Sequence, residues 1–218
     1  MKIESTALPD MFRIIPDQIA DRRGSFHETW RAEPLEAALE RPFVVRQVNV
    51  SVSRRNTLRG IHGTLTPPGQ AKLVTCEHGA VLDVVVDLRI GSPTYGEFVV
   101  TRQDAESGIG IFMAEGLGHA FLALTDDVRM NYLCSTEYVP GTMVDVQALD
   151  PEIGIPWGLD SQPIRSDKDA AAPSLAEAAA AGLLPTYAAC RALYERSEQT
   201  AAVSLQAAVA AGGIAGGI

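Results

Sequence analysis

Short runs of apolar and β-branched residues recur between Val44 and Val146, and no long helical pattern interrupts them. Turn signals rich in glycine and proline separate the runs, as at Gly91-Ser92-Pro93. We expect strands at the following segments: Val44–Ser53, Leu58–Ile61, Ala71–Glu77, Ala80–Leu88, Phe98–Arg102, Gly110–Met113, Ala120–Leu124, Val128–Ser135 and Met143–Val146. Many short strands at this spacing are typical of a sandwich or barrel, so the sequence predicts an all-β fold.

The first forty residues add shorter elements to this pattern. Phe12–Ile15 alternates as a half-buried strand does, and Ser25–Trp30 predicts a second strand after a turn. Pro34–Leu39 predicts one short helix with proline at its start. These segments extend the β-rich body toward the N-terminus.

Towards the C-terminus the pattern becomes helical. Ser174 and Glu177 form a capping box, which predicts a helix that ends near Gly182. A second helix is expected from Pro185 to about Glu198. We therefore expect one domain over residues 1–184, a C-terminal helix over 185–199, and an alanine- and glycine-rich tail over 200–218 whose composition is compatible with disorder.

The composition restricts the class of protein. Of 218 residues, 46% are apolar and 21% are charged, which is ordinary for a globular domain. The net charge of -9 argues against a nucleic-acid scaffold, but a few local arginines would suffice for a small phosphorylated ligand. The N-terminus lacks the apolar core of a signal peptide, and no apolar run has membrane-spanning length. We expect no membrane partner and a cytoplasmic location.

Cysteine usage agrees with that location. Cys76, Cys134 and Cys190 are widely spaced and form no CxxC pair. This pattern indicates free thiols in a reducing compartment rather than a disulfide framework or a zinc site.

Three residues with complementary chemistry lie close together between Leu58 and Leu73. Arg59 can hold a phosphate by its fork geometry, and His62 can move a proton near neutral pH. Lys72 can neutralise a developing oxyanion. Together they suggest proton transfer on an anionic substrate that carries a carbonyl group, although surface strands also often carry arginine and lysine.

Polar motifs follow one another along the β-rich segments in a recognisable order. They are RGSFHE at Arg23–Glu28, QVNVSVS at Gln47–Ser53, LRGIH at Leu58–His62, QAKLV at Gln70–Val74, DVVVDLRIGSPTYG at Asp83–Gly96, EGLGHAF at Glu115–Phe121 and SDKD at Ser166–Asp169. With these motifs the chain resembles the dTDP-4-dehydrorhamnose 3,5-epimerases and their relatives in antibiotic deoxysugar pathways. The resemblance covers about Phe12 to Leu184.

This resemblance implies a cupin-like jelly roll, a homodimer with shared active sites, and a metal-independent epimerase without a cofactor. The substrate it implies is a dTDP-4-keto-6-deoxyhexose. His62 matches the catalytic base, Asp169 its orienting carboxylate, Tyr132 the general acid, and Lys72 the lysine near the C4 oxygen. The residues that match the binding pocket are Gln47, Asn49, Arg59 and His119, with Tyr138 as a residue that packs against the sugar. Those that match the segment reaching a partner subunit's nucleotide are Arg23, Phe26 and Glu28.

The implied chemistry suits these residue types. A 4-keto group acidifies the C–H bonds at C3 and C5, so a base such as His62 can form an enolate whose charge Lys72 stabilises. Inversion needs a proton from the opposite face, which Tyr132 can supply. Asp169 would fix the tautomer of the imidazole.

Several of these assignments have an alternative. His119 has a comparable case as a turn cap, and Tyr132 alternates with core residues, so a packing role competes. Tyr138 is either a sugar-packing residue or the end of a strand. Asp167 competes with Asp169 for the place beside the histidine, and the family pattern of serine, variable residue, lysine and aspartate favours Asp169.

The function has alternatives as well. A dTDP-sugar 3,4-ketoisomerase would share the nucleotide pocket, and a non-catalytic sugar-nucleotide binding module would lack a need for the base and acid. Metal-binding cupins usually carry an HxH pair, which His62-Gly63-Thr64 breaks. The same Gly63-Thr64 pair departs from many double epimerases, which leaves open whether C3, C5 or both are inverted.

Overall fold

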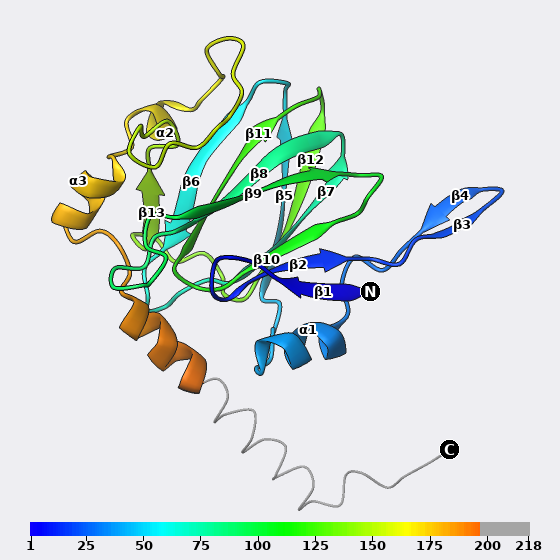
Figure 1. The fold of residues 1–218 in the computed structure, drawn as a ribbon, viewed down its shortest axis with the longest axis horizontal. Helices are drawn as coiled ribbons and strands as arrows, with labels where there is room; N and C mark the ends of the chain where they lie inside the picture. The colour runs from blue at the N-terminus through cyan, green and yellow to red at the C-terminus, as the bar shows by residue number, and fades with distance from the viewer. Residues whose placement is uncertain (197–218) are drawn as a thin grey trace, which may run out of the picture.

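The computed structural model describes residues 1–196, and two antiparallel sheets dominate it (Figure 1). The six-stranded sheet has the order β1 (Lys2–Ser5), β2 (Met11–Ile15), β10 (Gly110–Met113), β7 (Lys72–His78), β12 (Val128–Cys134) and β5 (Gln47–Ser53). The five-stranded sheet has the order β13 (Met143–Val146), β6 (Leu58–Thr64), β11 (Leu117–Ala123), β8 (Ala80–Asp87) and β9 (Phe98–Asp104). The predicted all-β architecture is confirmed.

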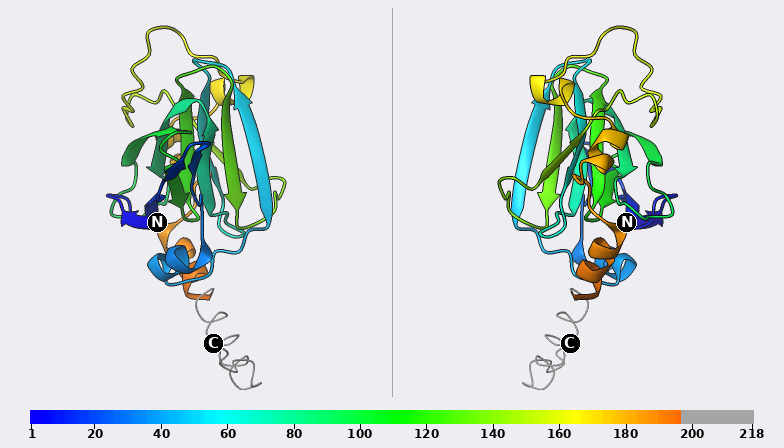
Figure 2. Two further views of the ribbon diagram at one scale, coloured as in Figure 1. Left: turned by 90° about the vertical axis from the view of Figure 1, so that its right-hand side faces the viewer. Right: turned by 90° about the vertical axis from the view of Figure 1, so that its left-hand side faces the viewer.

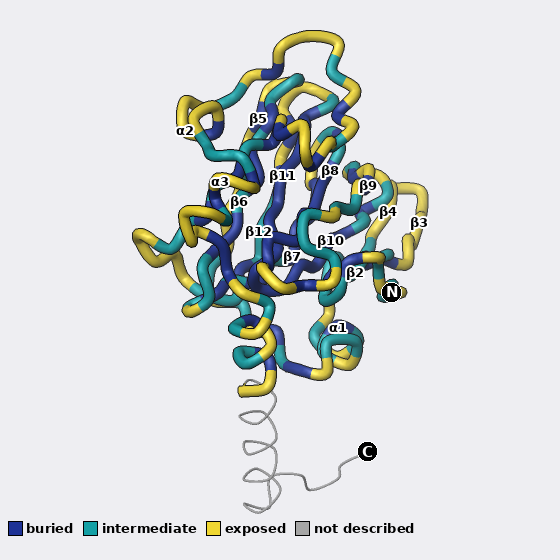
Figure 3. The backbone as a smooth tube through the Cα atoms, turned by 60° about the vertical axis from the view of Figure 1, so that its left-hand side comes forward, coloured by how far each residue is buried: buried dark blue, intermediate teal, exposed yellow. Residues whose placement is uncertain are grey.

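The core between the sheets follows from the alternation along each strand. On β8, Val81 and Val85 face the other sheet, while Val84 points to the opposite side. On β12, Met130 faces the same inner core. Figure 2 shows the two sheets from both sides, and Figure 3 shows that buried residues concentrate on their strands.

Part of the outer face of each sheet is also covered. Trp157 and α3 (Leu175–Ala180) pack on the outer face of the five-stranded sheet. On the six-stranded sheet, the covering elements are α1 (Ala32–Leu39) and a helix at residues 187–196, which lie at the same end of the sandwich (Figures 1 and 2). No helix within residues 1–196 is long and apolar enough to cross a membrane.

The C-terminal helices follow their predicted signals closely. Ser174 and Glu177 form the expected capping box at the start of α3, and Gly182 adopts a positive φ just after the helix ends. The next helix starts later than Pro185, because Thr186 forms a bridge with Ile90 and its hydroxyl accepts the Ala189 N–H at 3.1 Å. The end of that helix and the predicted tail at 200–218 lie outside the described residues.

The N-terminal segments depart further from the predictions. The predicted strand Ser25–Trp30 is wrong beyond Phe26, because β4 (Gly24–Phe26) pairs only with the three residues of β3 (Ile19–Asp21). This hairpin projects away from the sandwich (Figure 1). The helix α1 begins at Ala32, with Pro34 in its first turn, where a missing N–H costs no hydrogen bond. The sequence pattern missed β1, β3 and the short helix α2 (Asp167–Ala170).

Candidate active site

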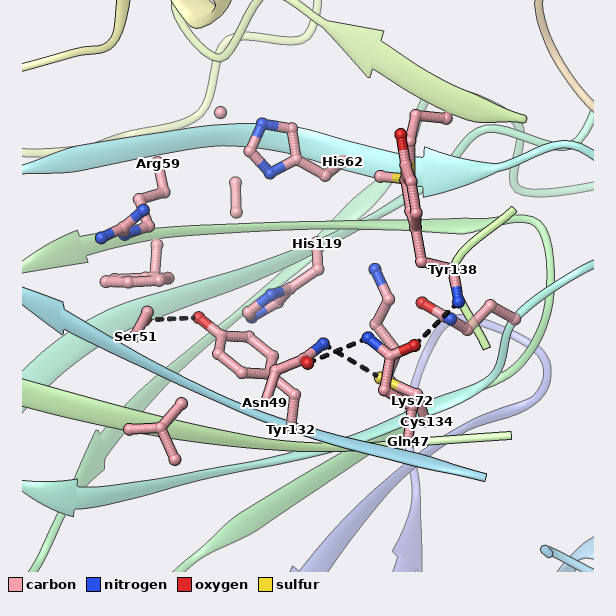
Figure 4. A pocket seen from close by; sticks show the side chains of 16 residues that line it. Gln47, Asn49, Ser51, Arg59, His62, Lys72, His119, Tyr132, Cys134 and Tyr138 are labelled. Carbon is pink, nitrogen blue, oxygen red and sulfur yellow. Dashed lines mark hydrogen bonds between the residues drawn. The ribbon is translucent and has the colours of Figure 1, made fainter. Parts of the chain in front are cut away.

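One cavity opens between the two sheets, where inward-facing core residues give way to polar ones (Figure 4). On β12, Met130 belongs to the core, and the next inward side chains, Tyr132 and Cys134, line the cavity. Its volume is about 270 Å³. The predicted site residues that it brings together are Gln47, Asn49, Arg59, His62, Lys72, His119, Tyr132 and Tyr138.

A β-bulge in β6 directs both Arg59 and His62 into this cavity. Opposite them on β11, His119 pairs with His62 and Phe121 pairs with Arg59, so three steps on β6 match two on β11. Strict alternation would place Arg59 and His62 on opposite faces of the sheet. The bulge re-aims one of them, as bulges beside functional sites often do.

His62 forms the dyad predicted for it. Its Nε2 atom lies 2.6 Å from Oδ1 of Asp169, and the other ring nitrogen points into the cavity (Figure 4). Ser166 caps α2 by accepting the Asp169 N–H at 3.1 Å, which fixes the start of the helix that carries the carboxylate. Gly60 gives the carboxylate room, since a Cβ there would lie 3.0 Å from Oδ1. The motifs LRGIH and SDKD therefore build one structural unit.

The Asp169 carboxylate stays ionised through the whole neutral range. Burial alone would raise its pKa, but the hydrogen bond with His62 and the donors at Gly60 and Ser166 outweigh burial, and its pKa falls to about 2. An ionised acceptor beside Nε2 favours the tautomer with the proton on that nitrogen. The cavity-facing nitrogen of His62 then carries the free lone pair.

Tyr132 enters the cavity from the other sheet. Its hydroxyl lies 3.0 Å from the hydroxyl of Ser51 on the neighbouring strand β5, and its ring packs edge-on against His119. Burial raises the pKa of Tyr132 to about 12, and the hydrogen bond with Ser51 opposes this shift. The phenol therefore holds its proton near neutral pH and can act as a donor.

Lys72 lies at the start of β7 on the wall shared with Cys134. Burial lowers the pKa of its ammonium group, while the Cys134 thiol acts in the opposite direction. Among the described residues, no hydrogen bond or ion pair involves the side-chain ammonium of Lys72, so it is available to an oxygen in the cavity.

Amide and guanidinium groups line the rest of the wall. Gln47 donates to Asn49 at 2.9 Å and accepts the backbone N–H of Tyr138 at 2.8 Å. Arg59 donates from Nε to Ser53 and from Nη2 to the Val52 carbonyl. Tyr138 itself is 58% exposed and stands at the edge of the cavity. The groups suit a polar, anionic ligand held along β5.

The three remaining predicted residues lie apart from the cavity. Arg23 and Phe26 belong to the projecting β3–β4 hairpin, where Phe26 is 64% exposed. Arg23 pairs with Asp21 at 2.6 Å, and Glu28 pairs with Arg31 at 3.7 Å. None of the three lines the cavity of its own chain.

The donor set does not resemble a metal centre. Among residues 1–196, no group of three or more histidine, cysteine, aspartate or glutamate side chains is arranged to hold a metal ion. The three cysteines are free and buried.

A family model described as dTDP-4-dehydrorhamnose 3,5-epimerase matches residues 5–177. The chain belongs to this family. It is 52% identical over 170 residues to a dTDP-4-dehydro-6-deoxyglucose 3-epimerase of Streptomyces bikiniensis, an alignment that covers 78% of this chain and 87% of that protein. It is 46% identical over 195 residues to a dTDP-4-dehydrorhamnose 3,5-epimerase of Mycolicibacterium smegmatis, which covers 89% of this chain and 96% of the relative.

The fold agrees with solved members of the epimerase family. A 3'-monoepimerase from Streptomyces bikiniensis, solved in complex with dTDP-quinovose, superposes with a TM-score of 0.86 at 46% identity. That match covers 89% of this chain and 98% of the other. The expected cupin-like jelly roll is confirmed.

Several residues in and around this cavity are not among the predicted site residues. Ser51 shares the alternating face of Gln47 and Asn49, so the period-2 pattern could have included it. Asp83, which lies 2.6 Å from Nε2 of His119, interrupts the apolar run of β8. No comparable sequence signal marks Asp145, because its place beside His62 depends on the pairing of β13 with β6.

Proposed function

We propose that this protein epimerises a dTDP-4-keto-6-deoxyhexose at C3, C5 or both, and so acts as an isomerase in deoxysugar biosynthesis. The observation that supports the proposal is that the His62–Asp169 pair and the Tyr132 phenol lie on opposite walls of one cavity, where they can serve as base and acid. His62 belongs to β6 of the five-stranded sheet, and Tyr132 to β12 of the six-stranded sheet.

The base step follows from the dyad. Asp169 accepts the Nε2–H of His62, so the cavity-facing nitrogen removes a proton from the carbon next to the ketone. The electron pair moves onto the C4 oxygen and forms an enolate. The ammonium of Lys72 is the cation that stabilises this charge.

The acid step completes the inversion. Tyr132 donates its proton to the same carbon from the other side of the ring, the enolate collapses to the ketone, and the configuration is inverted. A phenol with a pKa near 12 is protonated before the step and readily takes a proton back after it. Ser51 orients the hydroxyl.

The nucleotide end of the substrate is expected along Arg59, Gln47 and Asn49. A guanidinium already fixed by Ser53 and Val52 loses little freedom when it binds a diphosphate. Buried His119, held by Asp83, forms the back wall behind the sugar. The relatives include a 3-epimerase and a 3,5-epimerase, so the proposal covers inversion at one carbon or at both.

The proposal includes a homodimer in which the β3–β4 hairpin reaches the neighbouring active site. Exposed apolar side chains on the outer side of the edge strand β5, namely Val48, Val50 and Val52, support a subunit contact there. Phe26 and Arg23 on the projecting hairpin suit a stacked base and a phosphate. The cytoplasmic location belongs to the same proposal and is supported by the three free thiols.

Incubation with dTDP-4-keto-6-deoxyglucose in deuterium oxide tests the reaction. Proton NMR of the product should show deuterium at C3, C5 or both, together with the inverted epimer. A product whose carbonyl has moved to C3 would indicate a ketoisomerase instead. Binding of the nucleotide sugar without any exchange would indicate a binding module.

A further inference from the structure

A second carboxylate faces His62 besides Asp169. Asp145 on β13 is the register partner of His62, and its Oδ1 atom lies 3.8 Å from Nε2 of the imidazole. The Asp145 side chain is only 20% exposed. Two anions on one side of a single ring would favour the imidazolium and remove the free base that the reaction requires.

The positive charge of Lys168 compensates the Asp145 carboxylate at the oxygen that lies nearest to His62. Its Nζ lies 2.9 Å from Oδ1 of Asp145, the oxygen that is also nearest to His62. That oxygen is buried and accepts no well-aligned hydrogen bond, so the lysine charge is its compensation. Lys168 directly precedes Asp169 on α2, so one short helix carries both the partner of His62 and the cation that neutralises its competitor.

The other charged or titratable groups near His62 belong to the cavity already described. They are Arg59 on its own strand, His119 with Asp83 from β11 and β8, Lys72, Tyr132 and Cys134 from the six-stranded sheet, and Tyr138 at the edge. Among the described residues, Asp145 and Asp169 are the carboxylates within 4.0 Å of the His62 ring nitrogens.

We propose that Lys168 and Asp145 are positioning residues that set the basicity of His62 and leave Asp169 as the sole acceptor of its Nε2–H. This inference rests on the proposed function, since it assigns the two residues to the base of that reaction. The Lys168 side chain is 61% exposed, so its influence on the site falls as ionic strength rises.

A double-mutant cycle tests the pair. In Lys168→Met the uncompensated carboxylate of Asp145 should move the acidic limb of the kcat/KM profile up by about one pH unit. In Asp145→Asn the unpaired ammonium should move it down, and in the double variant the limb should return near the wild-type position. Lys168→Arg keeps the charge and should keep the wild-type profile. At pH values below this limb, the kcat/KM of Lys168→Met should be about tenfold lower than that of the wild type.

Lys2→Met is the matched control, because this substitution also removes the ion pair of an exposed lysine, here with Glu4. Lys2 lies on β1, an edge strand of the six-stranded sheet, away from His62. NMR titration of the His62 imidazole gives a readout that does not require turnover, so the pair can be tested even if the proposed substrate is wrong. If the His62 imidazole titrates at the same pH in Lys168→Met and in Lys2→Met, the inference is overturned. It is also overturned if the acidic limb of the double variant stays where it lies in Lys168→Met. Asp145→Asn is isosteric and should move the acidic limb of the kcat/KM profile in the opposite direction. It therefore keeps the test decisive if Lys168→Met folds poorly.

Discussion

The Nε2 atom of His62 and the Oδ1 atom of Asp169 lie 2.6 Å apart, so the other ring nitrogen of His62 faces the cavity. The two residues are 107 positions apart in the sequence. Gly60 and Ser166 bring them together by giving the carboxylate space and a fixed helix start. The orientation of one imidazole therefore depends on two distant motifs.

Replacement of His62 by alanine should abolish deuterium exchange at the sugar carbons while the protein still binds dTDP. Loss of one essential general base typically costs about 10²–10⁴-fold in rate. His78→Ala is a suitable control, because His78 is an exposed residue at the end of β7 that contacts the Asp127 carbonyl. Exchange at the wild-type rate in a folded His62→Ala protein would remove His62 from the mechanism.

Subunit mixing should restore activity if the β3–β4 hairpin completes a neighbouring site. We expect Arg23→Ala and His62→Ala to be impaired alone, because each damages a different part of every shared site. A mixed dimer contains one doubly damaged and one intact site, so a re-equilibrated equal mixture should recover about a quarter of wild-type activity. If a mixture that is shown to exchange subunits recovers no activity, the shared site is refuted. A fully active monomer would refute it as well.

Turnover should continue after chelation of divalent metals. The enolate charge is assigned to the Lys72 ammonium, and residues 1–196 contain no cluster of metal-ligating side chains. The measurement is kcat/KM before and after treatment with a chelator, with Lys72→Met as the variant expected to lose activity. Loss of activity on chelation that one divalent ion restores would contradict this assignment.

The stability of the protein should depend on Asp169 in a defined pH window. Its pKa is depressed to about 2 in the folded state, against about 3.9 in an unfolded chain. The stabilisation, on the order of 2 kcal/mol, is therefore complete above about pH 4 and is lost as the pH falls toward 2. Urea unfolding of wild type and Asp169→Asn should show a gap in the free energy of unfolding that closes over this window. A gap independent of pH would count against the dyad.

The sequence predicted the strands between Val44 and Val146 well, because period-2 patterns and turn residues are local signals. It also predicted the capping box at Ser174, which depends on residues three positions apart. It placed the end of β4 wrongly, since that end depends on the three-residue length of the partner strand β3. A strand boundary set by a partner leaves no local trace.

The motifs predicted which residues form the candidate site. The geometry of the site could not be predicted from the sequence. Arg59 and His62 share a face only because β6 contains a bulge, which alternation does not predict. Asp145 reaches His62 through the register of β13, and its nearest cation, Lys168, comes from a helix that the sequence pattern missed. Pairing register and helix placement are properties of the folded chain, and they decide which charges surround the base.

The placement of the base and the acid on opposite sheets is tested most directly by Tyr132→Phe. Phenylalanine keeps the ring that packs against His119 and removes the hydroxyl that bonds to Ser51. With dTDP-4-keto-6-deoxyglucose in deuterium oxide, deuterium incorporation into recovered substrate and formation of the epimer are measured in the same reaction. We predict that deuterium still enters the substrate, since His62 and Lys72 remain, and that epimer formation is lost. Epimer formation at the wild-type rate in Tyr132→Phe would show that Tyr132 is a packing residue and would contradict this account.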